Sequence, residues 1–128
     1  MKKLLIITLL IASSNIFASE VYWMKAIELD VKVNSSNWSG WEKIDYPIDV
    51  KFSFTDHRII VYTETLQIID YNQLTSITTN DYILYKSLGT DTNYNFVEIQ
   101  LYLYKKLGIV ILKIAYSDLE YKYKLIFN

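Results

Sequence analysis

Few residues of this chain have side chains suited to chemical catalysis. His57 is the single histidine, and it lies between Asp56 and Arg58 in a polar stretch that separates two strand-like segments. A serine-type triad needs a nucleophile positioned beside a histidine, and nothing in the sequence marks one. The chain has no cysteine, which excludes thiol catalysis and leaves only carboxylates beside one histidine as zinc ligands. We therefore expect a turn histidine, no metal and no cofactor.

The 14 aspartates and glutamates are the remaining groups for acid–base chemistry. Two carboxylates that meet in a fold can act as general acid and base, as in glycoside hydrolases. Here they are scattered, mostly on the polar side of alternating segments, which favours solvated surface charge. Phosphate-binding loops need clustered glycines, and Gly40, Gly89 and Gly108 lie far apart. We predict that the protein is not an enzyme, and a hydrolase built on carboxylates stays open as an alternative.

Aromatic side chains suggest binding instead. The chain has 12 Tyr, 5 Phe and 3 Trp, and the segment NWSGWEKIDYP places Trp38, Trp41 and Tyr46 in or beside a polar loop. Exposed Trp and Tyr dominate many interfaces, and loops on a rigid scaffold often carry binding residues. We predict that this loop binds a ligand or partner. The alternative is that Trp38 and Trp41 fold back and close one end of a barrel.

A second aromatic row lies on residues 94–104. Tyr94, Phe96, Tyr102 and Tyr104 fall on the polar side of the alternation in this segment. An exposed apolar row of this size needs a cover, which is either a second sheet or a partner. We include Tyr94, Tyr102 and Tyr104 in the candidate binding surface, with packing between sheets as the alternative.

The elements that must position these residues are strands. Apolar and polar residues alternate along most of the chain after residue 20, with polar breaks at 34–40, 55–58, 89–93, 105–108 and 117–120. Alternation with period two predicts strands that have one dry face. In the first strand we expect that face to carry Val21, Trp23, Ile27, Leu29, Val31 and Val33.

Short links between these segments make neighbouring strands antiparallel, because a parallel crossover needs a dozen or more residues. We predict an all-β, single-domain antiparallel meander of seven or eight strands. A small barrel, closed or partly open, would protect the strand edges. A two-sheet sandwich is the alternative.

The first 18 residues have the layout of a bacterial secretory signal peptide. Lys2 and Lys3 precede an apolar stretch, and the small residue Ala18 suits cleavage before Ser19. We expect a leader at 1–18, a single β domain at 19–128, and a periplasmic or secreted protein. Since the chain has no cysteine, it offers no residue for lipid attachment.

The charge balance limits the partners. The chain has 13 basic and 14 acidic residues, a net charge of −1, and loss of Lys2 and Lys3 with the leader makes it −3. Binding of nucleic acid needs a basic surface, so we exclude nucleic acid. We expect a non-catalytic module with a protein or glycan partner of unknown identity and no membrane association, and the oligomeric state stays open.

Two other functions also stay open. In a lipocalin-like carrier, Phe52, Phe54, Leu101 and Leu112 would line a cavity for a small apolar ligand instead of filling it. In a small outer-membrane-associated barrel, an apolar band would face outward all round. The alternation over residues 121–127 resembles the closing strand of that class, but charges are spread along most segments.

The stretch from Trp38 to Tyr71 contains the segments WSGW, IDVKFSF, RIIVY and QIIDY in this order. It resembles small uncharacterised β-rich proteins of gut bacteria and their tailed phages. The resemblance covers about a quarter of the chain. It implies a β fold, and it implies no activity.

Overall fold

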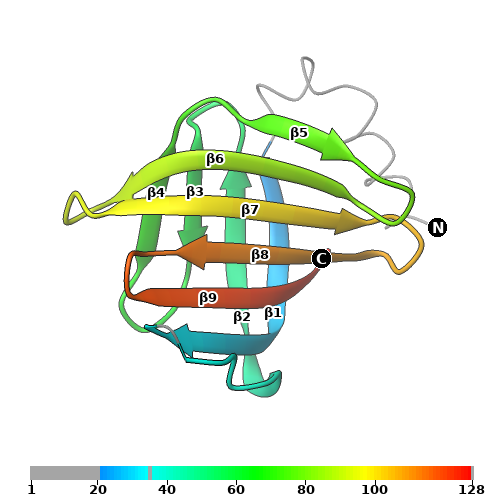
Figure 1. The fold of residues 1–128 in the computed structure, drawn as a ribbon, viewed down its shortest axis with the longest axis horizontal. Helices are drawn as coiled ribbons and strands as arrows, with labels where there is room; N and C mark the ends of the chain where they lie inside the picture. The colour runs from blue at the N-terminus through cyan, green and yellow to red at the C-terminus, as the bar shows by residue number, and fades with distance from the viewer. Residues whose placement is uncertain (1–20, 35, 128) are drawn as a thin grey trace.

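Nine β-strands and no helix form the part of the chain that the structure describes (Figure 1). The structure is a computed structural model, and it describes residues 21–34 and 36–127; the predicted leader lies outside these ranges. The strands are β1 (Val21–Val33), β2 (Glu42–Ser53), β3 (Arg58–Val61), β4 (Gln67–Tyr71), β5 (Thr75–Thr78), β6 (Ile83–Asp91), β7 (Phe96–Tyr104), β8 (Ile109–Ala115) and β9 (Leu119–Phe127).

Eight of these strands close into an antiparallel barrel. They lie in the order β4-β3-β2-β1-β9-β8-β7-β6, and β4 pairs with β6 to complete the circle. The short strand β5 extends along the other part of β6. In Figure 1, β6 to β9 run across the view, and β2, β3 and β4 run up and down behind them. Closure removes most free edges, and it confirms the predicted small barrel over the sandwich.

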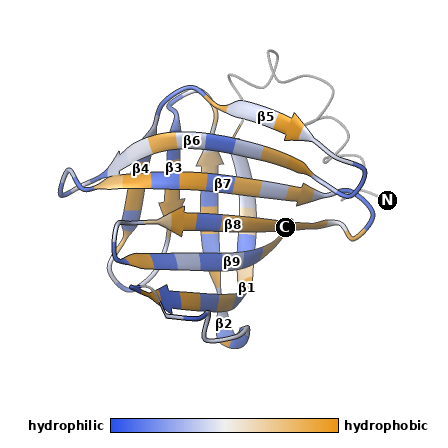
Figure 2. Ribbon diagram, in the orientation of Figure 1, coloured by the Kyte–Doolittle hydropathy of each residue, from blue (hydrophilic) through white to orange (hydrophobic). Residues whose placement is uncertain are grey.

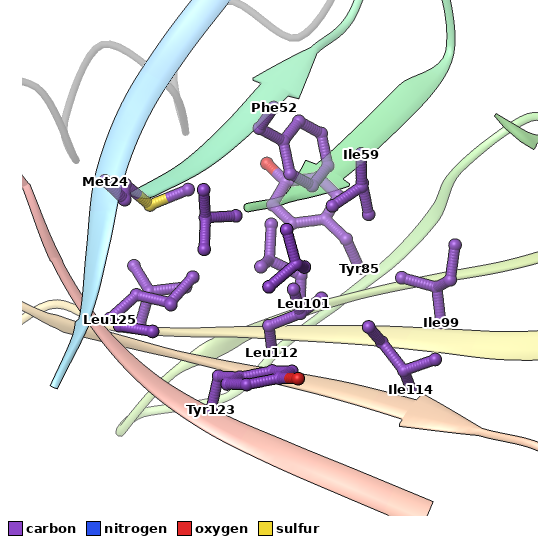
Figure 3. Packing of buried hydrophobic residues seen from close by; sticks show 14 of the residues in the cluster. Met24, Phe52, Ile59, Tyr85, Ile99, Leu101, Leu112, Ile114, Tyr123 and Leu125 are labelled. Carbon is purple, nitrogen blue, oxygen red and sulfur yellow. The ribbon is translucent and has the colours of Figure 1, made fainter. Parts of the chain in front are cut away.

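Buried side chains from every one of the eight barrel strands fill the interior. Figure 3 shows labelled residues such as Phe52, Leu101 and Leu112 pointing toward one another. An apolar void beside Phe52, Phe54 and Leu101 measures about 10 Å³, which is room for about one water molecule. The residues that we considered for a carrier cavity therefore pack against one another.

The predicted dry face of β1 is wrong in its first half. A β-bulge lies between Ala26 and Glu28, where the register to both β2 and β9 shifts. Ala26 is fully buried, whereas Val21 and Trp23 lie on the outer wall and Trp23 is 43% exposed. Beyond the bulge, Leu29 packs against the core as predicted, whereas Val33 at the end of the strand is exposed, contrary to the prediction. One extra residue in a strand exchanges its two faces, and simple alternation does not reveal it.

Gly89 lies in a strand and not in the predicted turn at 89–93. It is paired with Tyr71 where β4 closes onto β6. A Cβ atom at this position would collide with the backbone carbonyl oxygen of Asp70. Glycine therefore lets the two backbones approach, and the turn follows at residues 92–95.

The polar break at 55–58 forms the β2–β3 turn, as predicted. His57 is exposed and has a left-handed backbone conformation with φ at 51°, and its ring stacks on that of Tyr71 with 5.3 Å between the ring centroids. Arg58 donates to Asp70 across the β3–β4 pair at 2.6 Å. These contacts give the turn residues structural roles.

Candidate functional site

A groove of about 500 Å³ lies on the outer wall of the barrel, over β7, β8 and β9. Volumes of this order suit small ligands or short polymer segments. Four of the six predicted binding residues meet in it. The groove is lined by Trp38, Trp41, Tyr102, Tyr104, Leu107, Ile109, Ile111, Lys113, Lys122 and Lys124.

The floor of the groove follows from strand alternation. Hydrophilic and hydrophobic residues alternate along β9 and its neighbours (Figure 2), so Lys122 and Lys124 point outward while Tyr123 between them is buried. Lys122 is opposite Lys113 on β8, and Lys124 is opposite Ile111. Residues of three consecutive strands thus form cross-strand rows on one surface.

The β1–β2 loop folds onto this wall because a buried carboxylate holds it. Asp30 is only 3% exposed. Its Oδ1 accepts hydrogen bonds from the backbone N–H of Gly40 at 2.9 Å and from Ser39 Oγ at 3.2 Å. Its Oδ2 lies 3.5 Å from Lys122 Nζ. A buried carboxylate is stable only with such partners. Asp30 was not among the predicted site residues, because its place on a polar strand face indicated ordinary surface charge.

Trp38 and Trp41 lie over the lysines of the wall. Lys122 Nζ is 4.0 Å from the centroid of the Trp38 ring and 5.3 Å from that of Trp41. Lys124 Nζ is 5.1 Å from Trp41, and Lys113 Nζ is 5.8 Å from Trp38. Cation–π contacts of this kind contribute about 0.5–2 kcal/mol. The two tryptophans are therefore part of the outer wall and do not close a barrel end.

Tyrosines form the other side of the groove. The ring of Tyr82 lies 5.3 Å from that of Tyr102 and 5.5 Å from that of Tyr104. Tyr102 donates a hydrogen bond to Gln100 Oε1 at 2.8 Å. Burial, followed by the neighbouring tyrosines, raises the pKa of Tyr104. Tyr82 thus covers the Tyr102 and Tyr104 end of the predicted row, whereas Phe96 is 85% exposed. The described strands form one sheet, so packing by a second sheet does not occur there.

The lysines of the groove have carboxylate partners that lie outside its lining. The ion pairs are Lys113–Glu120 at 3.1 Å, Lys122–Asp30 at 3.5 Å and Lys124–Glu28 at 2.7 Å. Burial alone would raise the pKa of Glu120, but contacts with Lys113 and Lys32 outweigh it and lower this pKa. Among the described residues, the lining itself presents three ammonium groups and no carboxylate. These lysines were not among the predicted site residues, because their approach depends on the pairing of β8 with β9.

Tyr46 and Tyr94 do not line the groove. Tyr46 is 87% exposed and lies in residues 44–47 of β2, which have no partner in the β1 register. Tyr94 is 85% exposed in the β6–β7 turn, with φ at 63°. Tyr46 and Tyr94 are therefore separate from the four predicted residues that line the groove.

No protein-family model, no curated protein and no solved structure matches this chain. Residues 21–34 and 36–127 contain no helix that is long and apolar enough to cross a membrane. In the same residues, no three His, Asp or Glu side chains come together as metal ligands. The structure thus defines a small antiparallel β-barrel with an aromatic, lysine-lined groove on its outer wall.

Proposed function

We propose that this protein is a non-catalytic binding module that holds an acidic glycan in its outer-wall groove. One observation carries the proposal: Trp38, Trp41, Tyr102 and Tyr104 line the groove together with three lysines, and no carboxylate is in the described lining. Aromatic faces and ammonium groups in one groove complement a ligand that combines apolar faces with negative charge.

Acidic sugars have this combination. The C–H face of a sugar ring gains by leaving water for an aromatic surface. Its carboxylate or sulfate accepts charge-assisted hydrogen bonds from lysine. Trp41 is 37% exposed, so part of its ring is available for such stacking although Lys122 and Lys124 lie near it.

The interior supports a carrier function less well. The void beside Phe52 and Leu101 measures only about 10 Å³, whereas ligand pockets usually measure about 300–1,000 Å³. The groove on the wall falls within that range.

The outer wall also favours water over a bilayer. It carries ion pairs such as Lys25–Asp49 and Arg58–Asp70 on the side away from the groove. A lysine or arginine facing lipid at the bilayer midplane costs about 2–4 kcal/mol. With the predicted leader at 1–18, we propose a periplasmic or secreted protein that meets glycans of the cell envelope.

A glycan array tests this function. The array should carry uronate-containing, sialylated and sulfated glycans beside neutral glycans of similar length. We expect the protein to retain acidic glycans, the Trp41→Ala variant to lose at least tenfold in affinity, and Trp23→Ala, on β1 outside the groove lining, to bind normally. Equal retention of neutral glycans, or no retention of any glycan, would contradict the proposal. A protein captured from the envelope fraction through Trp41 would then identify a protein partner instead.

A further inference from the structure

A second pocket, distinct from the groove, lies at one mouth of the barrel. It measures about 470 Å³ and is lined by side chains of β1, the β3–β4 connection, β4, the β6–β7 turn and the β8–β9 region. The turns that form it are the ones at the left of the barrel in Figure 1. Mouths of β-barrels are common positions for small-molecule sites.

The charged side chains that line this mouth are acidic, whereas those that line the groove are basic. Its lining includes Tyr116, Tyr121 and Tyr123 together with the carboxylates of Glu64 and Asp91. No lysine, arginine or histidine is among the described residues that line it. From these contacts we propose that the barrel mouth is a binding site for a small organic cation, a primary or quaternary ammonium group.

In the mouth of the barrel, a chain of hydrogen bonds leads from Tyr123 through Gln67 and Tyr116 to the carboxylate of Asp91. Tyr123 donates its hydroxyl proton to Gln67 Oε1 at 3.3 Å, and Gln67 is also hydrogen-bonded to Tyr116. Tyr116 in turn donates to Asp91 Oδ2 at 3.1 Å. Because these phenol protons are already used, the pocket presents electron-rich oxygens and ring faces. Such a surface suits a ligand that brings positive charge and N–H donors.

Asp91 stays charged in this arrangement. Burial would raise its pKa, but hydrogen bonds from Asn95, Tyr116 and Asn93 outweigh burial and lower it. Asp91 Oδ1 accepts the backbone N–H groups of Asn93 and Asn95, each at 2.9 Å. The turn thus fixes a negative charge at the rim of the pocket.

Aromatic rings supply the second attraction. Tyr121 and Tyr123 stack with 6.3 Å between centroids and an interplanar angle of 18°, and Leu29 adds apolar surface. Cations bind over the faces of such rings, and quaternary ammonium groups use them most often. An anion would be repelled by Asp91 and Glu64, and a purely apolar ligand would leave the polar groups without water.

Choline and its neutral isostere 3,3-dimethylbutan-1-ol test this site as a matched pair. NMR titration of the tyrosine ring signals, at constant ionic strength, should give choline at least tenfold tighter binding than the isostere. Glu64→Gln, a change in an exposed side chain, should weaken choline severalfold, and Tyr121→Leu should abolish binding. Trp41→Ala in the groove should leave choline binding unchanged, which separates this site from the proposed glycan site.

A second arm uses vesicles of phosphatidylcholine. Cosedimentation that Glu64→Gln reduces would assign the cation to a lipid headgroup, whereas binding of free choline alone would assign it to a dissolved ligand. Equal affinity for choline and the neutral isostere would overturn the proposal. So would the absence of any tyrosine shift with choline, or choline affinity that Glu64→Gln does not change.

Discussion

The ammonium group of Lys122 lies 4.0 Å from the centre of the Trp38 ring. This contact joins the β1–β2 loop to the barrel wall, because Lys122 belongs to β9 and Trp38 to the loop. Asp30 forms an ion pair with the same lysine, with 3.5 Å between Asp30 Oδ2 and Lys122 Nζ. One lysine thus links the buried anchor of the loop to the aromatic surface that we propose as a binding site.

Asp30→Ala should release the loop. The substitution removes a buried acceptor of the Gly40 N–H and the ionic partner of Lys122. Loss of one partner from such a buried network costs about 3 kcal/mol. Urea unfolding should show this loss, and tryptophan emission should move to longer wavelength as Trp38 and Trp41 gain water.

Asp49→Ala is the matched control for Asp30→Ala. Asp49 forms an ion pair with Lys25 at 2.8 Å, but both side chains are nearly half exposed. Exposed pairs contribute at most about 1 kcal/mol. If the two substitutions changed the free energy of unfolding equally, Asp30 would not be the anchor of the loop.

Lys124→Met should weaken binding of an acidic glycan and make it less dependent on salt, because Lys124 lines the groove and its partner Glu28 is not buried. Methionine keeps much of the apolar stem and removes the charge, and exposed charge interactions are screened over about 8–10 Å at physiological salt. Titrations at two salt concentrations measure the change. Lys51→Met is the control, because Lys51 lies 5.7 Å from the ring of Trp23 on another part of the wall; an equal effect there would argue against the groove.

Gly89→Ala should destabilise the barrel at its closing contact. The added methyl group collides with the carbonyl oxygen of Asp70, and overpacking of this kind costs about 1–3 kcal/mol. Thermal unfolding measures the effect against Thr90→Ala, a neighbouring change that should cost little. A stable Gly89→Ala variant would show that β4 and β6 can separate without loss.

Alkaline pH should destabilise the protein through its buried tyrosines. Burial raises the pKa of Tyr123 from 10.0 to about 12. Since the folded pKa is raised, this contribution to stability is full below pH 10 and is lost as pH rises toward 12. Tyr123→Phe should therefore make the fall in unfolding free energy between pH 10 and 12 less steep. Absorbance at 295 nm should lose one late-titrating phenol in the variant; unchanged titration would contradict the assignment.

The sequence predicted the barrel but not the details that close and bend it. Alternation along each strand is local, so it predicted that Phe52 and Leu101 face the interior, whereas the choice between a filled interior and a ligand cavity came only from the structure. The bulge at Ala26 and the close approach at Gly89 depend on pairing with distant strands. A glycine near polar residues has the same local pattern in a turn and in a closing strand, which is why residues 89–93 were predicted as a turn.

The candidate site was predicted in its aromatic part alone. Trp38 and Trp41 stood out by residue type in a polar loop, and Tyr102 by an aromatic row on a polar face. The lysines were not predicted as site residues, because Lys113 and Lys122 lie on polar strand faces and come together only through the β8–β9 register. Tyr46 shared the aromatic character of the loop, yet it lies in residues 44–47, which do not pair with β1, and it is not part of the groove lining.

The indole N–H signals of the three tryptophans would show whether an acidic glycan binds in the groove. The ¹⁵N-labelled protein would be titrated with a pool of uronate-containing, sialylated and sulfated oligosaccharides, and its indole resonances followed by NMR. We predict that the signals of Trp38 and Trp41 shift in a saturable way while that of Trp23 stays in place. If the Trp38 and Trp41 signals did not move, or if the Trp23 signal moved equally, the groove would not be a specific site for acidic glycans.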